Sequence, residues 1–148
     1  MGLKVYYCED LTSKDREHFM NFYHFWSSPD QTGNLLFFPG TFLVSWESDR
    51  TGDIEAFLVL DRATLLLETL AYRTTLVART LLQQTQRELG NDKTIKTVCP
   101  TWNTKKSEQL TSIGFRRPSW LFNHHVMTFR GPEEEEVKGP FTCWFIKA

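Results

Sequence analysis

The chain has 148 residues, 41% hydrophobic and 14% aromatic, which predicts one globular domain with a buried core and excludes a disordered chain. Its net charge is −1, and no run approaches the roughly 20 apolar residues needed to cross a bilayer, so we expect no membrane contact. The three cysteines lack the paired spacing of a disulfide framework, and we therefore expect a reducing, cytoplasmic compartment.

The charge is distributed unevenly along the chain. Residues 1–68 hold 5 basic and 11 acidic side chains, a net of −6, whereas residues 69–130 hold 10 basic and 3 acidic ones, a net of +7. Residues 131–148 hold 2 basic and 4 acidic side chains, a net of −2. A basic segment can serve a phosphate-bearing ligand, a nucleic acid or an acidic protein surface, and a solvated helix face explains it equally well.

The N-terminal part predicts a strand followed by a helix. Residues 4–7 are β-prone and read as an opening strand. Thr12 and Asp15 have the spacing of a capping box, which marks a helix start. The aromatic residues that follow have the i, i+3, i+4, i+7 spacing of one buried helix face: Phe19, Phe22, Tyr23 and Trp26.

A hairpin and a third strand come next. Residues 41–47 and 53–61 each read as a strand, and the turn between them contains Gly52, which suits a positive φ angle, so the two strands should form a hairpin. Residues 64–70 are almost wholly apolar and predict a central strand that is covered on both faces.

Strands and helices then alternate. Residues 74–89 predict a helix that ends at Gly90, with an inner stripe of Ala78, Leu81, Leu82, Thr85 and Leu89. A strand over 94–99 and a helix over 103–113 follow, then a strand that begins at Phe115 and a last core strand over 126–130. This order predicts an α/β domain in which a mixed sheet has helices on both faces.

Residues 72–82 follow an apolar strand and open a helix. Within them Arg73 is followed by two residues, then Leu76, one residue and Ala78. This spacing resembles the acetyl-CoA motif of the GCN5-related N-acetyltransferase family, which reads Arg or Gln, two residues, Gly, one residue, then Gly or Ala. The arginine and the alanine match, and the leucine stands where the first glycine belongs.

A second segment supports the same resemblance. The family pattern there is Asn, six residues, Tyr, three residues, Gly-Phe. Asn103, Gly114 and Phe115 match it at the right spacing, and Leu110 replaces the tyrosine. The order and separation of the two segments place residues 4–130 on the family plan, so the resemblance implies a central twisted mixed sheet with helices on both faces.

The resemblance also implies a site for acetyl-CoA. In this family the pyrophosphate lies on backbone N–H groups where a strand turns into a helix, whose N-terminus carries roughly half a positive charge. The positions that would hold the cofactor are Arg73, Thr74, Thr75, Leu76, Val77, Ala78, Arg79 and Asn103. A glycine lets a phosphate approach the backbone closely, and the leucine side chain would crowd that approach. The two arginines fit a solvated helix end equally well.

The acid and the base of the family's reaction are also altered. The tyrosine often acts as general acid toward the CoA thiolate, and Leu110 cannot donate a proton. Glu68 is the candidate base because it interrupts an apolar strand, where a carboxylate must be paired, hydrated or perturbed. Alternatively, Glu68 lies in solvent at the end of the strand or pairs with Arg73. Positioning alone can still drive acetyl transfer.

Residues 131–148 differ in kind from the predicted domain over 1–130. Four consecutive glutamates form a solvated linker, and an apolar tail follows with Phe141, Trp144, Phe145 and Ile146. Such a tail should not remain in water. It either folds back on its own sheet or binds a protein partner, including a second copy of the chain.

Three readings of function remain open. The first is a structural or interaction protein on a degenerate acetyltransferase scaffold, similar to acetyltransferase-like virion components of short-tailed bacteriophages. The second is a working acetyl-CoA-dependent N-acetyltransferase. The third is a nucleic-acid-binding module that uses basic and aromatic residues, namely Trp102, Lys105, Lys106, Arg116, Arg117 and Trp120. No histidine or cysteine spacing matches a zinc site, so we expect no metal.

Overall fold

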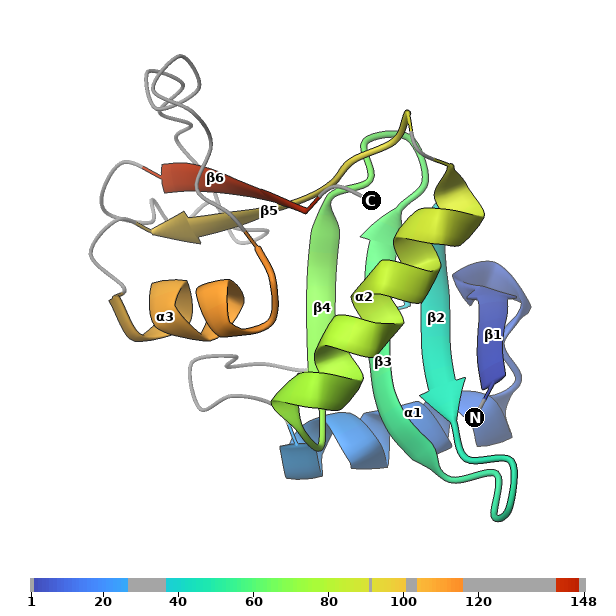
Figure 1. The fold of residues 1–148 in the computed structure, drawn as a ribbon. Helices are drawn as coiled ribbons and strands as arrows, with labels where there is room; N and C mark the ends of the chain where they lie inside the picture. The colour runs from blue at the N-terminus through green and yellow to red at the C-terminus, as the bar shows by residue number, and fades with distance from the viewer. Residues whose placement is uncertain (1, 27–36, 91, 101–103, 116–140, 147–148) are drawn as a thin grey trace.

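A computed structural model describes residues 2–26, 37–90, 92–100, 104–115 and 141–146, and Figure 1 shows their arrangement. The strands are β1 (Gly2–Tyr7), β2 (Thr41–Glu47), β3 (Ile54–Asp61), β4 (Leu67–Tyr72), β5 (Ile95–Pro100) and β6 (Phe141–Ile146). The helices are α1 (Ser13–Trp26), α2 (Thr75–Leu89) and α3 (Thr104–Ser112), with a short 3₁₀ turn, η1 (Cys8–Asp10). None of the described helices is long and apolar enough to cross a membrane.

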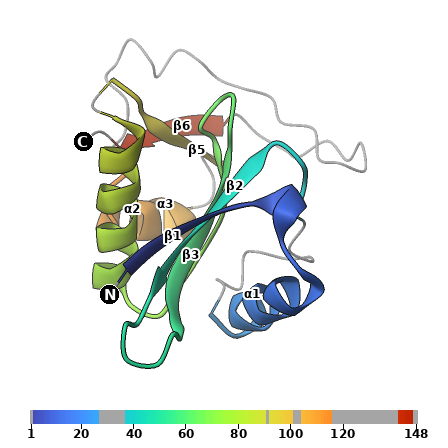
Figure 2. The ribbon, with the colours of Figure 1, turned by 90° about the vertical axis from the view of Figure 1, so that its right-hand side faces the viewer.

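The strands form a mixed sheet in two parts. β1, β2, β3 and β4 pair in that order, each antiparallel to its neighbour, and β5 pairs antiparallel with β6. A single parallel bridge between Leu66 and Lys96 joins the parts. Figure 2 shows α1 and α2 on opposite faces of the four-stranded part. The predicted α/β class, a mixed sheet with helices on both faces, is confirmed.

Each face of the sheet has its own core. On the α1 face, Phe57 of β3 lies edge-on to Phe19 and Phe22, with ring centroids 5.3 and 5.9 Å apart. On the α2 face, Ala78, Leu81 and Leu82 are fully buried together with apolar residues of β2, β3 and β4. Both helices therefore bury the faces that their periodicity predicts.

The predicted local signals hold where they can be checked. The Asp15 N–H donates to Thr12 Oγ1 at 3.1 Å, and the Thr12 N–H donates to Asp15 Oδ2 at 3.4 Å, so the capping box forms. Gly52 has a φ of 70° in the turn of the hairpin. Helix α2 ends at Gly90, whose φ of 106° suits a residue without a side chain.

The third strand begins later than the predicted 64–70. Asp61 Oδ1 accepts the N–H groups of Ala63 at 2.9 Å and Thr64 at 2.8 Å, which holds the chain in a turn. Leu65 continues that turn with a φ of 59°. Pairing with β3 starts only at Leu67, because these side-chain bonds compete with the ladder.

The C-terminal segment joins the sheet of its own chain. β6 pairs with β5 from Ile95 opposite Ile146 to Pro100 opposite Phe141, which is the first of the two alternatives for the tail. The predicted strand over 126–130, the glutamate linker and the boundary between 130 and 131 lie outside the described residues. Phe115 is the last described residue after α3, and it is buried with 1% exposure. The rest of the strand predicted to begin there also lies outside the described residues.

Candidate functional site

The candidate site lies where β4 and β5 separate. The two strands are joined through Lys96, which pairs with Leu66 and donates its N–H to the carbonyl oxygen of Leu65 at 3.1 Å. Beyond this point they belong to different sheets and diverge (Figure 1). Helix α2 begins at Thr75, three residues after the end of β4. Within the described residues, a splayed pair of strands thus opens beside a helix N-terminus.

A β-bulge distorts β4 at the candidate base. Val59 of β3 pairs with Thr69 and Leu60 pairs with Leu67, so Glu68 is an extra residue without a partner opposite. A bulge bends its strand and redirects the side chain at that point, and bulges are frequent next to active sites. The sequence predicted Glu68 as an interruption of the apolar run, but the bulge that sets its direction depends on pairing with β3.

The surroundings of Glu68 shift the pKa of its carboxyl upward. Partial desolvation raises the pKa of the Glu68 carboxyl, and the nearby carboxylate of Asp61 adds to the rise. The side chain is nevertheless exposed, so it can exchange protons with water. Burial raises the pKa of the Cys8 thiol, and the charges of Glu9 and Glu68 contribute, which places Glu68 near Cys8 of the α1-side core.

The N-terminus of α2 keeps two open N–H groups. Thr74 caps the helix: its Oγ1 accepts the N–H of Val77 at 3.2 Å, and its carbonyl oxygen accepts the N–H of Ala78 at 3.1 Å. The N–H groups of Thr75 and Leu76 donate to no residue in the described part of the chain. An anion can therefore still find main-chain donors here, but fewer than at an uncapped turn.

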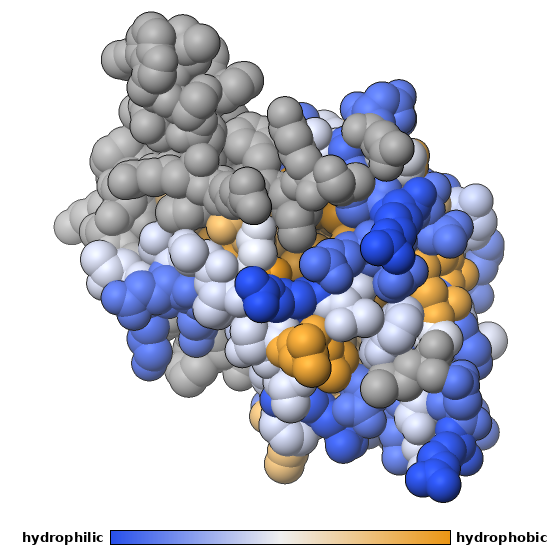
Figure 3. Space-filling view, viewed as in Figure 1, coloured by the Kyte–Doolittle hydropathy of each residue, from blue (hydrophilic) through white to orange (hydrophobic). Residues whose placement is uncertain are grey.

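Leu76 stands beside these donors. Its side chain is 71% exposed, and Figure 3 shows an apolar spot over the N-terminal half of α2. Side chains on a helix lean toward its N-terminus, so this one leans toward the region that an anion would occupy. An exposed leucine at a helix start contributes little to packing, so the fold itself does not require a large apolar side chain here.

Arg73 is held away from this position. Its Nε lies 3.8 Å from Glu55 Oε2, and its guanidinium carbon is 5.5 Å from the centre of the Trp26 ring. Its N–H donates to the carbonyl oxygen of Glu55 at 3.0 Å. Arg73 therefore pairs with Glu55 and not with Glu68, as one alternative had proposed. The exposed side chain of Glu68 agrees with the other alternative, in which it lies in solvent.

Leu110 and Tyr72 are both packed against the α2-side core. Leu110, which stands in for the family's tyrosine, is a core residue with 6% exposure. Tyr72 is the last residue of β4, and its half-buried ring packs against the α2-side core. Burial raises the pKa of the Tyr72 phenol.

The predicted cofactor positions thus have different surroundings. Thr75 and Arg79 are exposed, Val77 is half-buried, and Ala78 is fully buried against the sheet. Asn103 lies outside the described residues. Their role in holding a cofactor stays a prediction, and so does partner binding by the apolar residues of β6.

The nucleic-acid reading rests on few described residues. Lys105 is exposed and Lys106 half-buried on α3, while the other four residues of that set lie outside the described part. Among the residues that the structure describes, no group of three histidines, cysteines or acidic residues is arranged to hold a metal ion.

Comparison with known proteins shows the class of fold. No protein-family model matches the sequence, and no curated protein matches it closely enough to indicate a relative. Solved structures do match over almost the whole chain. An N-acetyltransferase from Staphylococcus aureus has a TM-score of 0.62 at 8% identity, covering 99% of this chain and 98% of that one.

Two further structures agree. A probable acetyltransferase from Staphylococcus epidermidis has a TM-score of 0.61 at 10% identity, covering 99% of each chain. A putative N-acetyltransferase from Escherichia coli, bound to coenzyme A, has a TM-score of 0.53 at 13% identity and covers 100% of each chain. The chain therefore has the fold of the N-acetyltransferases.

Proposed function

We propose that this chain uses the acetyltransferase fold mainly as a protein-interaction component of a larger assembly, and that it binds acetyl-CoA weakly. The observation that carries the proposal is Leu76, exposed at the N-terminus of α2 where a pyrophosphate would need bare main chain. The cap by Thr74 supports it, since it occupies the N–H of Val77. The assembly that the sequence resemblance implies is a phage virion.

Calorimetric titration with coenzyme A tests the steric part. The intact chain should bind only at millimolar ligand, and Leu76→Gly should bind at least about tenfold more tightly, because the glycine opens the two free amides to phosphate. Gln83→Gly is the matched control: the same helix receives a glycine at an exposed position two turns away. Micromolar binding by the unmodified chain would contradict the proposal.

The interaction part concerns β6, for which the partner residues would be Phe141, Trp144, Phe145 and Ile146. Because β6 pairs with β5 in the same chain, a deletion of this strand would damage the sheet and is not a clean test. Light scattering of the full chain from micromolar to near-millimolar concentration is cleaner. We expect a dimer or larger species that Phe145→Lys disperses while the far-ultraviolet spectrum is unchanged. A monomer at every concentration would exclude self-association.

A working N-acetyltransferase is the second candidate, and the bulge at Glu68 favours it. A carboxyl with a raised pKa on a distorted strand beside the splayed strands is suited to take a proton from an amine. Transfer of acetyl from acetyl-CoA to a panel of amines tests this function. Activity that Glu68→Gln abolishes, while coenzyme A binding is unchanged, would establish catalysis. Activity that the variant retains would rule out Glu68 as the base.

A further inference from the structure

A hollow lies at the closed end of the splayed strands, beside the junction of Leu65 with Lys96 and apart from the N-terminus of α2. It has a volume of about 430 Å³ and is open to solvent on one side. The wall comes from the end of the β3–β4 turn, the last residues of α2 and the start of β5. Helix α2 runs from its N-terminus at the open end of the splayed strands (Figure 1) to Leu89, which lines the hollow.

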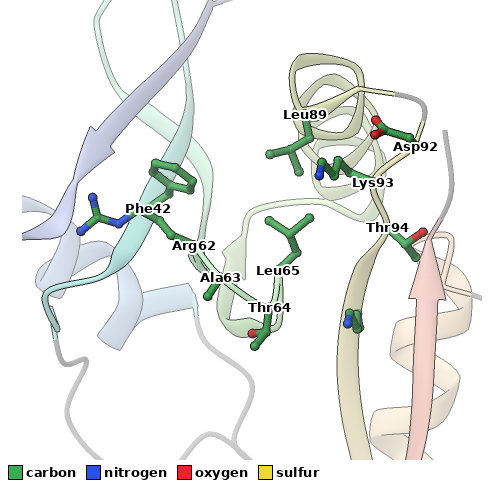
Figure 4. A pocket seen from close by; sticks show the side chains of 10 residues that line it. Phe42, Arg62, Ala63, Thr64, Leu65, Leu89, Asp92, Lys93 and Thr94 are labelled. Atoms are coloured by element: carbon green, nitrogen blue, oxygen red, sulfur yellow. The ribbon is translucent and has the colours of Figure 1, made fainter.

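The middle of the hollow is apolar. Figure 4 shows Phe42 of β2 facing Leu65 and Leu89 across the space. Leu65 has a φ of 59°, a left-handed conformation that is unfavourable for leucine. Such conformations persist where the surroundings impose them, and they are enriched at ligand sites. Here the conformation aims an apolar side chain into the space.

Two ammonium groups contribute charge without a described partner. Lys93 and Lys96 line the hollow, and neither forms an ion pair with a residue in the described part of the chain. In Figure 4 the Lys93 side chain lies beside Leu89. The lining contains one carboxylate, that of Asp92, so the two lysines leave an excess of positive charge.

The third cation of the lining, Arg62, already has an ion-pair partner. The guanidinium of Arg62 forms an ion pair with Glu9, and its central carbon lies 5.0 Å from the centre of the Tyr7 ring and 5.6 Å from that of Phe42. Arg62 lines the hollow, but its guanidinium points away from Leu65 and Leu89 (Figure 4). Among the described residues, the cations of the lining without an ion pair are therefore the two lysines.

From this combination we propose that the hollow binds a small carboxylate with an apolar body. The apolar body lies among Phe42, Leu65 and Leu89, and the carboxylate meets Lys93 and Lys96. The site is separate from the acetyl-CoA region, so the proposal does not depend on the proposed function. It adjoins the hydrogen bond between Leu65 and Lys96 that joins the two parts of the sheet.

The test compares octanoate with octanamide, its neutral analogue, by calorimetry on the full chain. Octanoate should bind, and octanamide should bind several-fold more weakly. Lys93→Gln and Lys96→Gln should each weaken octanoate by about two- to fivefold, as expected for one exposed charge pair. Lys105→Gln on α3 removes the same charge at a distant exposed position and should leave binding unchanged.

Leu65→Asn provides a variant that should keep the turn, since asparagine tolerates the left-handed conformation. The melting temperature of this variant should be no lower than that of the unmodified chain. It should bind octanoate more weakly, because the apolar side chain of Leu65 no longer lines the hollow. Equal binding of octanoate and octanamide would overturn the proposal. So would unchanged binding by a folded Leu65→Asn variant, or no binding of octanoate at millimolar concentration.

Discussion

Replacing Gln86 with leucine should destabilise the fold more than its conservative shape suggests. Gln86 lies on α2 with no exposed surface, and its amide makes three hydrogen bonds to the loop that leads into β5. Its Nε2 donates to the carbonyl oxygens of Gly90, at 3.2 Å, and of Lys93, and its Oε1 accepts the N–H of Ile95 at 3.3 Å. The side chain therefore ties the end of α2 to the start of β5.

The magnitude follows from what leucine leaves behind. The N–H of Ile95 belongs to a residue with no exposed surface, and an unsatisfied buried group of this kind costs about 1–3 kcal/mol. Gly90 is half-buried and Lys93 exposed, so water can replace those two bonds at small cost. The buried leucine side chain offsets part of the loss. We expect a net loss of about 2 kcal/mol in the free energy of unfolding.

Urea unfolding followed by tryptophan fluorescence measures this loss. With a slope of about 1–3 kcal/mol per molar urea, the midpoint should fall by roughly 1 M. Gln83→Leu is the control: it makes the same chemical change at an exposed position on the same helix, where about 0.5 kcal/mol or less is expected. Equal midpoints for the two variants would refute the claim that Gln86 acts as a buried clamp.

Three further predictions concern local interactions. Thr12→Ala should cost about 1 kcal/mol of unfolding free energy by loss of the helix cap, and Thr12→Ser, which keeps the hydroxyl, should restore most of it. Because the pKa of Glu68 is raised in the folded state, the fold loses stability as pH rises through the window above the carboxyl's ordinary value of 4.5. The free energy of unfolding of Glu68→Gln, measured by denaturant titration, should thus rise relative to that of the unmodified chain as the pH is raised above that value. A difference in unfolding free energy that does not change with pH would contradict this. Burial, followed by the charge and hydrogen bond of Glu47, raises the pKa of Tyr6 to about 12. Ultraviolet titration should therefore show one tyrosine that ionises at higher pH than an ordinary phenol. This transition should be absent in Tyr6→Phe and should shift to lower pH in Glu47→Gln.

Coenzyme A titration and octanoate titration probe opposite ends of α2. The first depends on the amides of Thr75 and Leu76, and the second on lysines beyond the C-terminus of the helix. Each can fail while the other succeeds, so the results separate the proposed function from the further binding site.

The sequence by itself determined the features that depend on near neighbours along the chain. The capping box of Thr12 and Asp15, the positive φ of Gly52 and the buried face of α2 all follow from residues a few positions apart. The alternating order of strands and helices then favoured the α/β class, because few topologies accommodate that order.

Only the tertiary structure decided the features that depend on distant partners. Glu68 is bulged because of its register with β3, Arg73 meets Glu55 and Trp26 rather than the helix entrance, and the C-terminal strand pairs with β5. Local propensity carries no information about these contacts, because each partner lies far away in sequence and is brought close only when the sheet assembles. The sequence therefore names candidate residues for the site, and the surroundings of those residues come from the tertiary contacts.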